Sequence, residues 1–191
     1  MSDFELTPDK LPFIAESLGV DKTQVDEFFS LFKEFYKTVG LQHLAHVIRA
    51  MELLIREKDN NPLFRIEWKP MPKSETTKIA VSLRWRNKYG IVVPHELVNE
   101  HDLVKLRVHV AHELGHLFYI TCYPKNNGDR ALSQKMANVF GVFTMLERNE
   151  FYKEKSPKMC HDTWPDVISD FMQLDSKETQ DKIEPVLLHG N

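Results

Sequence analysis

The chain has few cysteines and no long apolar run, and these absences narrow the class of protein. Its 191 residues contain two cysteines, Cys122 and Cys160, which are too few for a disulfide framework. No apolar stretch approaches the roughly 20 residues that are needed to span a membrane. The lack of a long apolar run predicts a protein without a membrane-spanning segment. The small number of cysteines favours reduced thiols, which are the default in the cytoplasm, so we expect a cytoplasmic protein.

The chain also lacks a strong net charge. Its 25 Lys and Arg residues against 28 Asp and Glu residues give a formal net charge of −3, so no global field attracts nucleic acid or anionic lipid. Residues 1–5 lack the basic region and apolar core of a signal peptide, and none is expected. The hydrophobic content of 42% and charged content of 28% are typical of a soluble globular protein large enough to bury a core.

The most informative stretch is 107–119, in which His112, Glu113 and His116 form the pattern H-E-x-x-H. Residues four apart on a helix lie one above the other, so both imidazoles can reach one metal ion. Glu113 lies at the flank of that ion, where it can take a proton from water. Zinc metallopeptidases use this arrangement, and zinc binds imidazole while keeping one position open. The pattern therefore predicts Zn²⁺ held by His112 and His116, with Glu113 as the catalytic base.

The alternative is a pair of hydrogen-bonded histidines in an ordinary core. Two apolar stripes surround the motif at helical spacing and predict a helix that is buried on two sides. Burying two imidazoles and a carboxylate without partners is costly, so a buried helix favours the metal site. The stripes are Val104, Val108, Ala111, Gly115 and Phe118, and Leu103, Leu106, Val110, Leu114 and Leu117.

Several other residues near the motif, or elsewhere in the chain, are weaker candidates for the site. His109 lies about 10.5 Å from His116 along the helix axis, too far for one ion with bonds of about 2.0–2.1 Å. We therefore expect His109 to line the cleft or to support a ligand. Tyr119 and His161 are candidates for stabilising an oxyanion. Cys122 is expected to be a small buried thiol, with zinc ligation as the alternative.

Helices are expected on both sides of a short run of strands. A helix ends at Gly19, a longer one is capped by Asp21, and a third begins near Leu44. The longer helix has an aromatic-rich face that we assign to the core, with a partner surface as the alternative. After the motif, a helix is expected at 131–146, a basic surface turn at 153–158, and a last helix from Trp164; the tail at 175–191 carries little signal.

Alternating apolar residues predict strands at 63–68 and 78–85, and a short apolar run predicts another at 89–93. A tight hairpin at 87–88 is expected to join the last two. The fold class is therefore α+β: N-terminal helices, a small, mostly antiparallel three-stranded sheet packed on the H-E-x-x-H helix, and further C-terminal helices. An edge strand of such a sheet can hold an extended peptide.

Residues 14–25 show a second pattern, the spacing of a helix-turn-helix, with Ala15, Gly19 and Val25 at the packing positions. A DNA-binding second helix needs basic and amide side chains. This helix carries three acidic side chains, Asp21, Asp26 and Glu27, which repel phosphates. Any tight helix pair shows the same spacing, so binding to nucleic acid is disfavoured.

Three segments together resemble the ImmA/IrrE family of metallopeptidases: 89–93, 106–116 and 137–146. The Ala-His-Glu-Leu-Gly-His run is common to several zinc peptidase families, whereas the Ala-Asn-x-Phe pattern at 137–140 is more specific. The resemblance covers roughly 63–146. It implies a small sheet against an active-site helix, in an intracellular protein of bacteria or their phages and mobile elements. Family members cleave or inactivate helix-turn-helix repressors, so a repressor-like protein is the expected partner.

The resemblance suggests three regions: N-terminal helices at 1–60, a zincin-like metallopeptidase core at 61–150, and a C-terminal helical extension and tail at 151–191. Family members usually place a third zinc ligand, a glutamate, where this chain has Gln134, and many have a further histidine where this chain has Ile120. A glutamine oxygen can bind zinc, but without charge it binds more weakly. Gln134 or water is the expected third ligand, followed by Asp129 and then Glu147.

Three functions follow from these patterns. The first is a zinc-dependent endopeptidase that acts on a regulatory protein and so on transcription. The second is a binding protein of the same fold, with weak or absent metal, that captures a repressor or defence protein without cutting it; Gln134 favours this alternative. The third is a DNA-binding regulator that uses the N-terminal helix pair.

Overall fold

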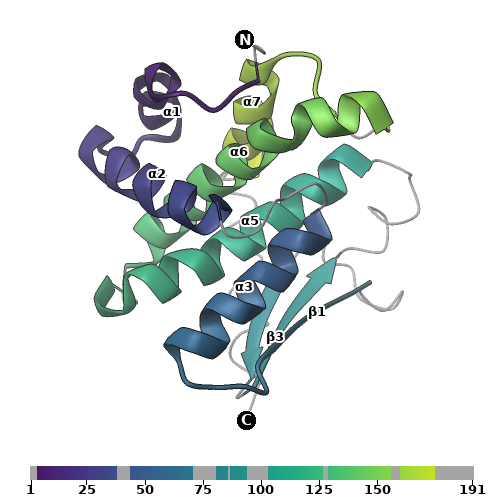
Figure 1. Ribbon diagram of the computed structural model, residues 1–191. Coiled ribbons are helices and arrows are strands. Elements are labelled where there is room, and N and C mark those ends of the chain that lie inside the picture. The colour runs from purple at the N-terminus through teal and green to yellow at the C-terminus, as the bar shows by residue number, and fades with distance from the viewer. Residues whose placement is uncertain are drawn as a thin grey trace.

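The computed structural model describes residues 4–37, 44–70, 81–85, 87–93, 103–126, 129–155 and 160–174. It confirms an α+β fold in which helices predominate over one small sheet (Figure 1). The longer helices are α1 (Leu11–Leu18), α2 (Lys22–Lys37), α3 (Leu44–Lys58), α5 (Leu103–Cys122), α6 (Arg130–Lys155) and α7 (Trp164–Leu174). The strands are β1 (Arg65–Pro70), β2 (Val81–Trp85) and β3 (Lys88–Val93), and the short 3₁₀ helices are η1 (Pro8–Lys10) and η2 (Pro124–Asn126).

The first helix ends, and the second begins, where the sequence predicts. Gly19 ends α1 with a φ of 59°, a left-handed conformation that favours glycine. The Asp21 carboxylate caps α2 by accepting hydrogen bonds from the backbone N–H groups of Thr23 (2.8 Å) and Gln24 (3.3 Å). The small and apolar residues of the helix-turn-helix spacing, Ala15 and Val25, are buried in the core. In this structure that spacing packs two helices together.

The aromatic face of α2 lies in the core, as predicted. Phe28, Phe32 and Phe35 are buried. They contact aromatic side chains of the two long helices: Phe28 lies 5.3 Å from Phe118 of α5, and Phe32 lies 5.6 Å from Phe140 of α6, between ring centroids. These contacts attach the N-terminal helices to α5 and α6, which pack along one another (Figure 1).

The sheet has three strands in the order β1-β3-β2, and its directions correct one expectation. The β2–β3 pair is antiparallel, as its short connection requires, but β1 runs parallel to β3. The sheet is therefore mixed rather than mostly antiparallel. Alternation of apolar residues identifies a strand and its faces but carries no information on its direction. Residues 78–80, expected to begin the second strand, lie outside the described residues.

The sheet packs against α5 through its central strand. Tyr89, Ile91 and Val93 of β3 are buried, and the Tyr89 hydroxyl donates a hydrogen bond to the backbone carbonyl of Glu113 at 2.9 Å. α3, which also contacts α5, is fixed to β1 because the buried Glu52 carboxylate accepts a hydrogen bond from the Ile66 N–H at 2.9 Å. The Tyr89 hydrogen bond therefore ties the predicted metal helix to the sheet.

The helix α6 is longer than its apolar pattern predicts. It continues to Lys155, so the surface turn expected at 153–158 is wrong at least up to that residue; residues 156–159 lie outside the described part. The reason is that the last two turns contain mostly Glu, Lys and Arg, which are good helix formers but carry no apolar period. Within the described ranges, no helix combines the length and hydrophobicity that a membrane crossing needs.

Candidate metal centre

The H-E-x-x-H helix is buried, as its two apolar stripes predict. α5 lies between β3 and α6, and His112 and Glu113 expose only 5% and 6% of their surfaces. His116, one turn further along, is half-buried. Polar groups at this depth require partners, and the partners come from α6.

The two imidazoles converge on one point. The Nε2 atoms of His112 and His116 lie 3.1 Å apart. Two nitrogens bound to one tetrahedral zinc at about 2.05 Å are separated by about 3.3 Å. The spacing of the two rings therefore fits zinc with only a small adjustment.

The outer nitrogens of both rings are held by α6. His112 Nδ1 lies 2.7 Å from the Asn138 Oδ1 atom, and His116 Nδ1 lies 3.1 Å from the Ser133 hydroxyl. Because the Asn138 oxygen can only accept, Nδ1 of His112 donates the proton, and Nε2 keeps a free lone pair. Metal-binding histidines are oriented in this way, with the second nitrogen bonded to the protein. Neither Asn138 nor Ser133 was singled out from the sequence as a site residue.

Gln134 lies at the same point as the two imidazoles. Its Nε2 atom is 3.2 Å from Nε2 of His112, to which it donates a hydrogen bond. Turning the terminal amide by 180° exchanges nitrogen for oxygen and directs Oε1 at the imidazole pair. Within the described ranges, no three His, Cys, Asp or Glu side chains form a metal-binding group.

The two acidic alternatives to Gln134 lie elsewhere. The Asp129 carboxylate is exposed and caps α6 by accepting a hydrogen bond from the Leu132 N–H at 2.9 Å. Glu147 is 13 residues beyond Gln134, about 20 Å along α6, and forms an ion pair with Lys33 at 2.8 Å. The structure therefore brings Gln134, and neither carboxylate, to the imidazole pair.

Burial keeps both imidazoles uncharged at neutral pH. It lowers the pKa of His116 to about 4, and it lowers the pKa of His112 well below its usual value, with a further contribution from the neighbouring His116. Burial also lowers the pKa of His109 to about 4, helped by Lys105 and opposed by Asp170. Neutral imidazole is the form that binds a metal ion, so the pair needs no deprotonation at pH 7.

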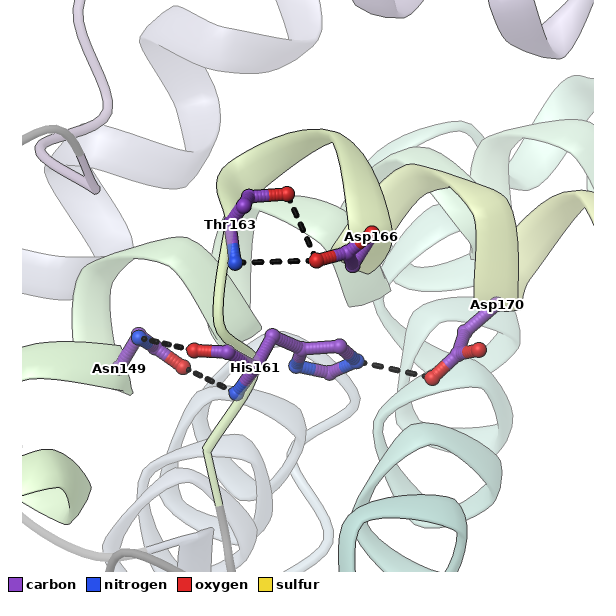
Figure 2. A network of polar contacts seen from close by, with 5 residues as sticks. All are labelled: Asn149, His161, Thr163, Asp166 and Asp170. Carbon is purple, nitrogen blue, oxygen red and sulfur yellow. Dashed lines mark hydrogen bonds and ion pairs between the residues drawn. The ribbon is translucent and has the colours of Figure 1, made fainter.

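The two residues suggested for an oxyanion differ in their surroundings. Tyr119 is buried, its ring centroid lies 5.3 Å from that of Tyr123, and its hydroxyl has no hydrogen-bond partner among the residues that the structure describes. His161 lies at the junction of α6 and α7 (Figure 2). There His161 Nε2 lies 2.8 Å from the Asp170 carboxylate, and its backbone N–H donates to Asn149 Oδ1 at 2.9 Å.

The junction of α6 and α7, where His161 lies, is far along α6 from the imidazole pair. Asn149 is 11 residues beyond Asn138, which is about 16 Å along α6. Figure 2 shows the His161 ring directed at Asp170, while Asp166 accepts hydrogen bonds from Thr163 at the start of α7. The described contacts of His161 therefore fasten α7 to α6, and Tyr119 remains the candidate on the motif helix.

A close crossing of α5 and α6 brings these groups together. Gly115 lies between the two histidines, and a Cβ atom there would stand 2.5 Å from the Ala137 carbonyl oxygen and 2.7 Å from its Cα. Such distances are shorter than any ordinary contact, so only glycine allows the two backbones to approach this closely. The approach places Ser133, Gln134 and Asn138 within reach of the imidazoles.

We expect Gly115→Ala to weaken zinc binding by about 10–100-fold, the usual effect of disturbing residues that orient metal ligands. The added methyl group must push α6 away, at a cost of about 1–3 kcal/mol in stability. Gly141→Ala is the matched control: it gains the same helix propensity, but its methyl group meets Phe171 of α7, at 2.2 Å. Competition with a fluorescent zinc chelator measures both affinities. Equal losses in the two variants would contradict this account of the crossing.

Comparison with known proteins adds no assignment: the chain matches no protein-family model, no curated protein and no solved structure. The resemblance to the ImmA/IrrE family therefore depends on the motif residues themselves. The function is inferred from the arrangement of α5 and α6.

Proposed function

We propose that the protein is a zinc-dependent endopeptidase of the ImmA/IrrE type. The observation that supports this function best is the convergence of His112, His116 and Gln134, with both outer imidazole nitrogens held by α6. The lone pair of His112 Nε2 faces His116 Nε2 at 3.1 Å and the Gln134 amide at 3.2 Å. Three side chains of the kinds that bind zinc therefore meet at one point, where a cation would contact all of them.

Each residue has a defined role in this proposal. His112 and His116 hold zinc through Nε2, and Gln134 contributes its amide oxygen as the third ligand. Bound zinc supplies a Lewis acid that polarises the scissile carbonyl and activates water. Glu113 takes the proton of the attacking water as the C–O bond forms, and returns it to the amine nitrogen as the C–N bond breaks.

The sheet offers a place for an extended substrate. Of the described strands, β1 and β2 are the outer ones, and each pairs with β3 on one side. An extended peptide can add to such an edge by backbone hydrogen bonds. The resemblance indicates a helix-turn-helix repressor as the substrate, with the protein acting inside a bacterial cell.

A second function is favoured by the neutral third ligand. Glutamine contributes no charge to the site, so zinc binds more weakly than with a carboxylate. A protein with this fold and a weak metal site can still capture a protein partner without cutting it. Metal content separates the two functions most directly.

As-purified protein should contain about one zinc per chain, because two preoriented imidazoles and an amide surround a single point. His112→Ala and His116→Ala should each lose the metal. His46→Ala, at an exposed histidine of α3, is the matched control and should retain it. Metal analysis of protein purified without chelator measures the content. Wild-type protein that stays metal-free when zinc is offered would contradict the peptidase and favour the binding protein.

A further inference from the structure

Two arginines are buried with no well-aligned hydrogen bond to any of the described residues. Arg107 of α5 exposes 3% of its surface and Arg148 of α6 exposes none. Among the described residues, the Nε atom and both Nη atoms of each guanidinium are shielded from solvent and form no well-aligned hydrogen bond, and only Tyr36 contributes a hydrogen-bonding contact to Arg148. Each guanidinium has five N–H donors and a permanent charge, so this is an expensive arrangement unless an anion accompanies it.

Two tyrosines complete what we name the arginine–tyrosine cluster: Arg107, Arg148, Tyr36 and Tyr152. The guanidinium carbon of Arg107 lies 3.6 Å from the centroid of the Tyr152 ring, and that of Arg148 lies 5.5 Å from the centroid of Tyr36. Within the described part of the chain, the Tyr36 hydroxyl is buried with no well-aligned hydrogen bond apart from its contact with Arg148, whereas the Tyr152 hydroxyl accepts one from the Leu44 N–H at 3.3 Å. The cluster thus lies where the ends of α2 and α6 meet the starts of α3 and α5.

The cluster is distinct from the metal centre. Arg107 precedes His112 by five residues, which is about 7.5 Å along the helix and about 140° around it. Its neighbours are Tyr152 and Arg148 near the end of α6, whereas the imidazoles contact residues near its start. A ligand in the cluster would not touch the predicted zinc ligands.

The described contacts do not neutralise the two positive charges. Burial lowers the pKa of Arg107 to about 10, and repulsion from Arg148 contributes, but both groups remain charged at neutral pH. Glu147 influences Arg148 electrostatically, yet its carboxylate is bonded to Lys33 at 2.8 Å. Stacking on tyrosine rings offsets only part of the cost of burying a charge. Both guanidiniums therefore keep their donors available.

We propose that the arginine–tyrosine cluster binds a phosphate group. Two guanidiniums match the charge of a phosphate dianion, and each can bond two of its oxygens in parallel. The cluster has about ten N–H donors and the Tyr36 hydroxyl to satisfy, whereas the two oxygens of a carboxylate accept roughly four hydrogen bonds. Phosphate has more acceptor oxygens and distributes them in three dimensions, so it fits two separate forks better than a planar carboxylate does.

Inorganic phosphate tests the proposal directly, as the probe in a thermal-unfolding titration of the full chain. The Tm should rise with phosphate until saturation, by about 5 °C or more in total, relative to sodium chloride at equal ionic strength. Nucleoside monophosphate is the second probe. A shift with inorganic phosphate alone assigns the site to the free ion, and a shift with both probes assigns it to a phosphate group on a larger ligand.

Amino-acid substitutions distinguish a phosphate-binding role of Arg148 from a role in packing. Arg148→Met should abolish the phosphate shift yet leave the phosphate-free Tm unchanged or higher, because it removes one of two repelling buried charges. Arg148→Lys keeps the charge but loses the planar fork, and should reduce the shift. Lys153→Met removes an exposed charge of α6 and should leave the shift intact. His116→Ala should also retain it, which makes this test independent of the proposed zinc site.

Three results would overturn the proposal. One is a Tm that responds to neither phosphate probe beyond the effect of chloride. Another is an Arg148→Met variant with a lowered Tm and a full phosphate shift, which would make the guanidinium a packing element. The last is a shift that disappears in Lys153→Met, which would place the phosphate at the surface.

Discussion

Glu113→Gln should lower the rate of peptide hydrolysis by about 100-fold or more while zinc stays bound, because a general base and acid typically contributes 10²–10⁴-fold. The residue lies on the motif helix next to His112, is buried, and is not a ligand in the proposed site. Glutamine has nearly the same shape but cannot accept and return a proton. The variant therefore removes the proton transfer and preserves the fold.

The measurement uses quenched fluorescent peptides and a candidate repressor as substrates, with zinc content determined on the same samples. Glu154→Gln, at an exposed position of α6, is the matched control and should retain full activity. Full hydrolysis by Glu113→Gln would exclude this residue as the base. A wild-type protein that binds zinc and a protein partner but cleaves nothing would favour the binding function.

The sequence correctly predicted the features that depend on residues close together in the chain, such as some helix ends and the faces of helices. Gly19 and Asp21 end one helix and begin the next through contacts within a few residues, and both were predicted correctly. The burial of α5 followed from its apolar stripes. His112 and His116 lie four residues apart on one helix, so their convergence also needed only local geometry.

The sequence did not predict which residues of α6 hold the outer nitrogens of the imidazoles, because those contacts depend on how two helices distant in the chain meet. Asn138 and Ser133 reach the imidazoles because α5 and α6 cross at Gly115, and no period in the sequence encodes that register. A signal was present for Asn138, a polar residue in the otherwise mostly apolar stretch 136–146 of α6. Of the α6 residues near the imidazoles, the resemblance to the ImmA/IrrE family implies a ligand role for Gln134 alone.

Two other features of the structure were not predicted for the same reason, because they depend on how distant parts of the chain meet. β1 and β3 pair although β2 lies between them in the chain, and alternation of side chains cannot reveal the direction of such a pair. Arg107 and Arg148 carry charges that normally lie at the surface, so nothing in their spacing indicated burial. Both arginines became informative only when the structure placed them together beside Tyr36 and Tyr152.

Gln134→Glu should tighten zinc binding by about 100-fold or more, because a full negative charge next to a divalent cation contributes several kcal/mol even at an effective dielectric constant of about 20. The side chain already lies 3.2 Å from His112 Nε2, so the new carboxylate needs no rearrangement to reach the ion. Gln173→Glu, at an exposed position of α7, adds the same charge away from the site and should leave zinc affinity unchanged. Competition with a zinc chelator measures both.

The activity of Gln134→Glu then decides between the two leading functions. Tighter zinc with retained or faster hydrolysis supports a peptidase whose third ligand is glutamine in place of glutamate, since Glu113 still performs the proton transfer. Tighter zinc without hydrolysis of any substrate favours a binding protein that keeps the metal centre as a structural element. Unchanged zinc affinity would contradict the placement of Gln134 beside the ion, because an added carboxylate within bonding distance of Zn²⁺ cannot be without effect.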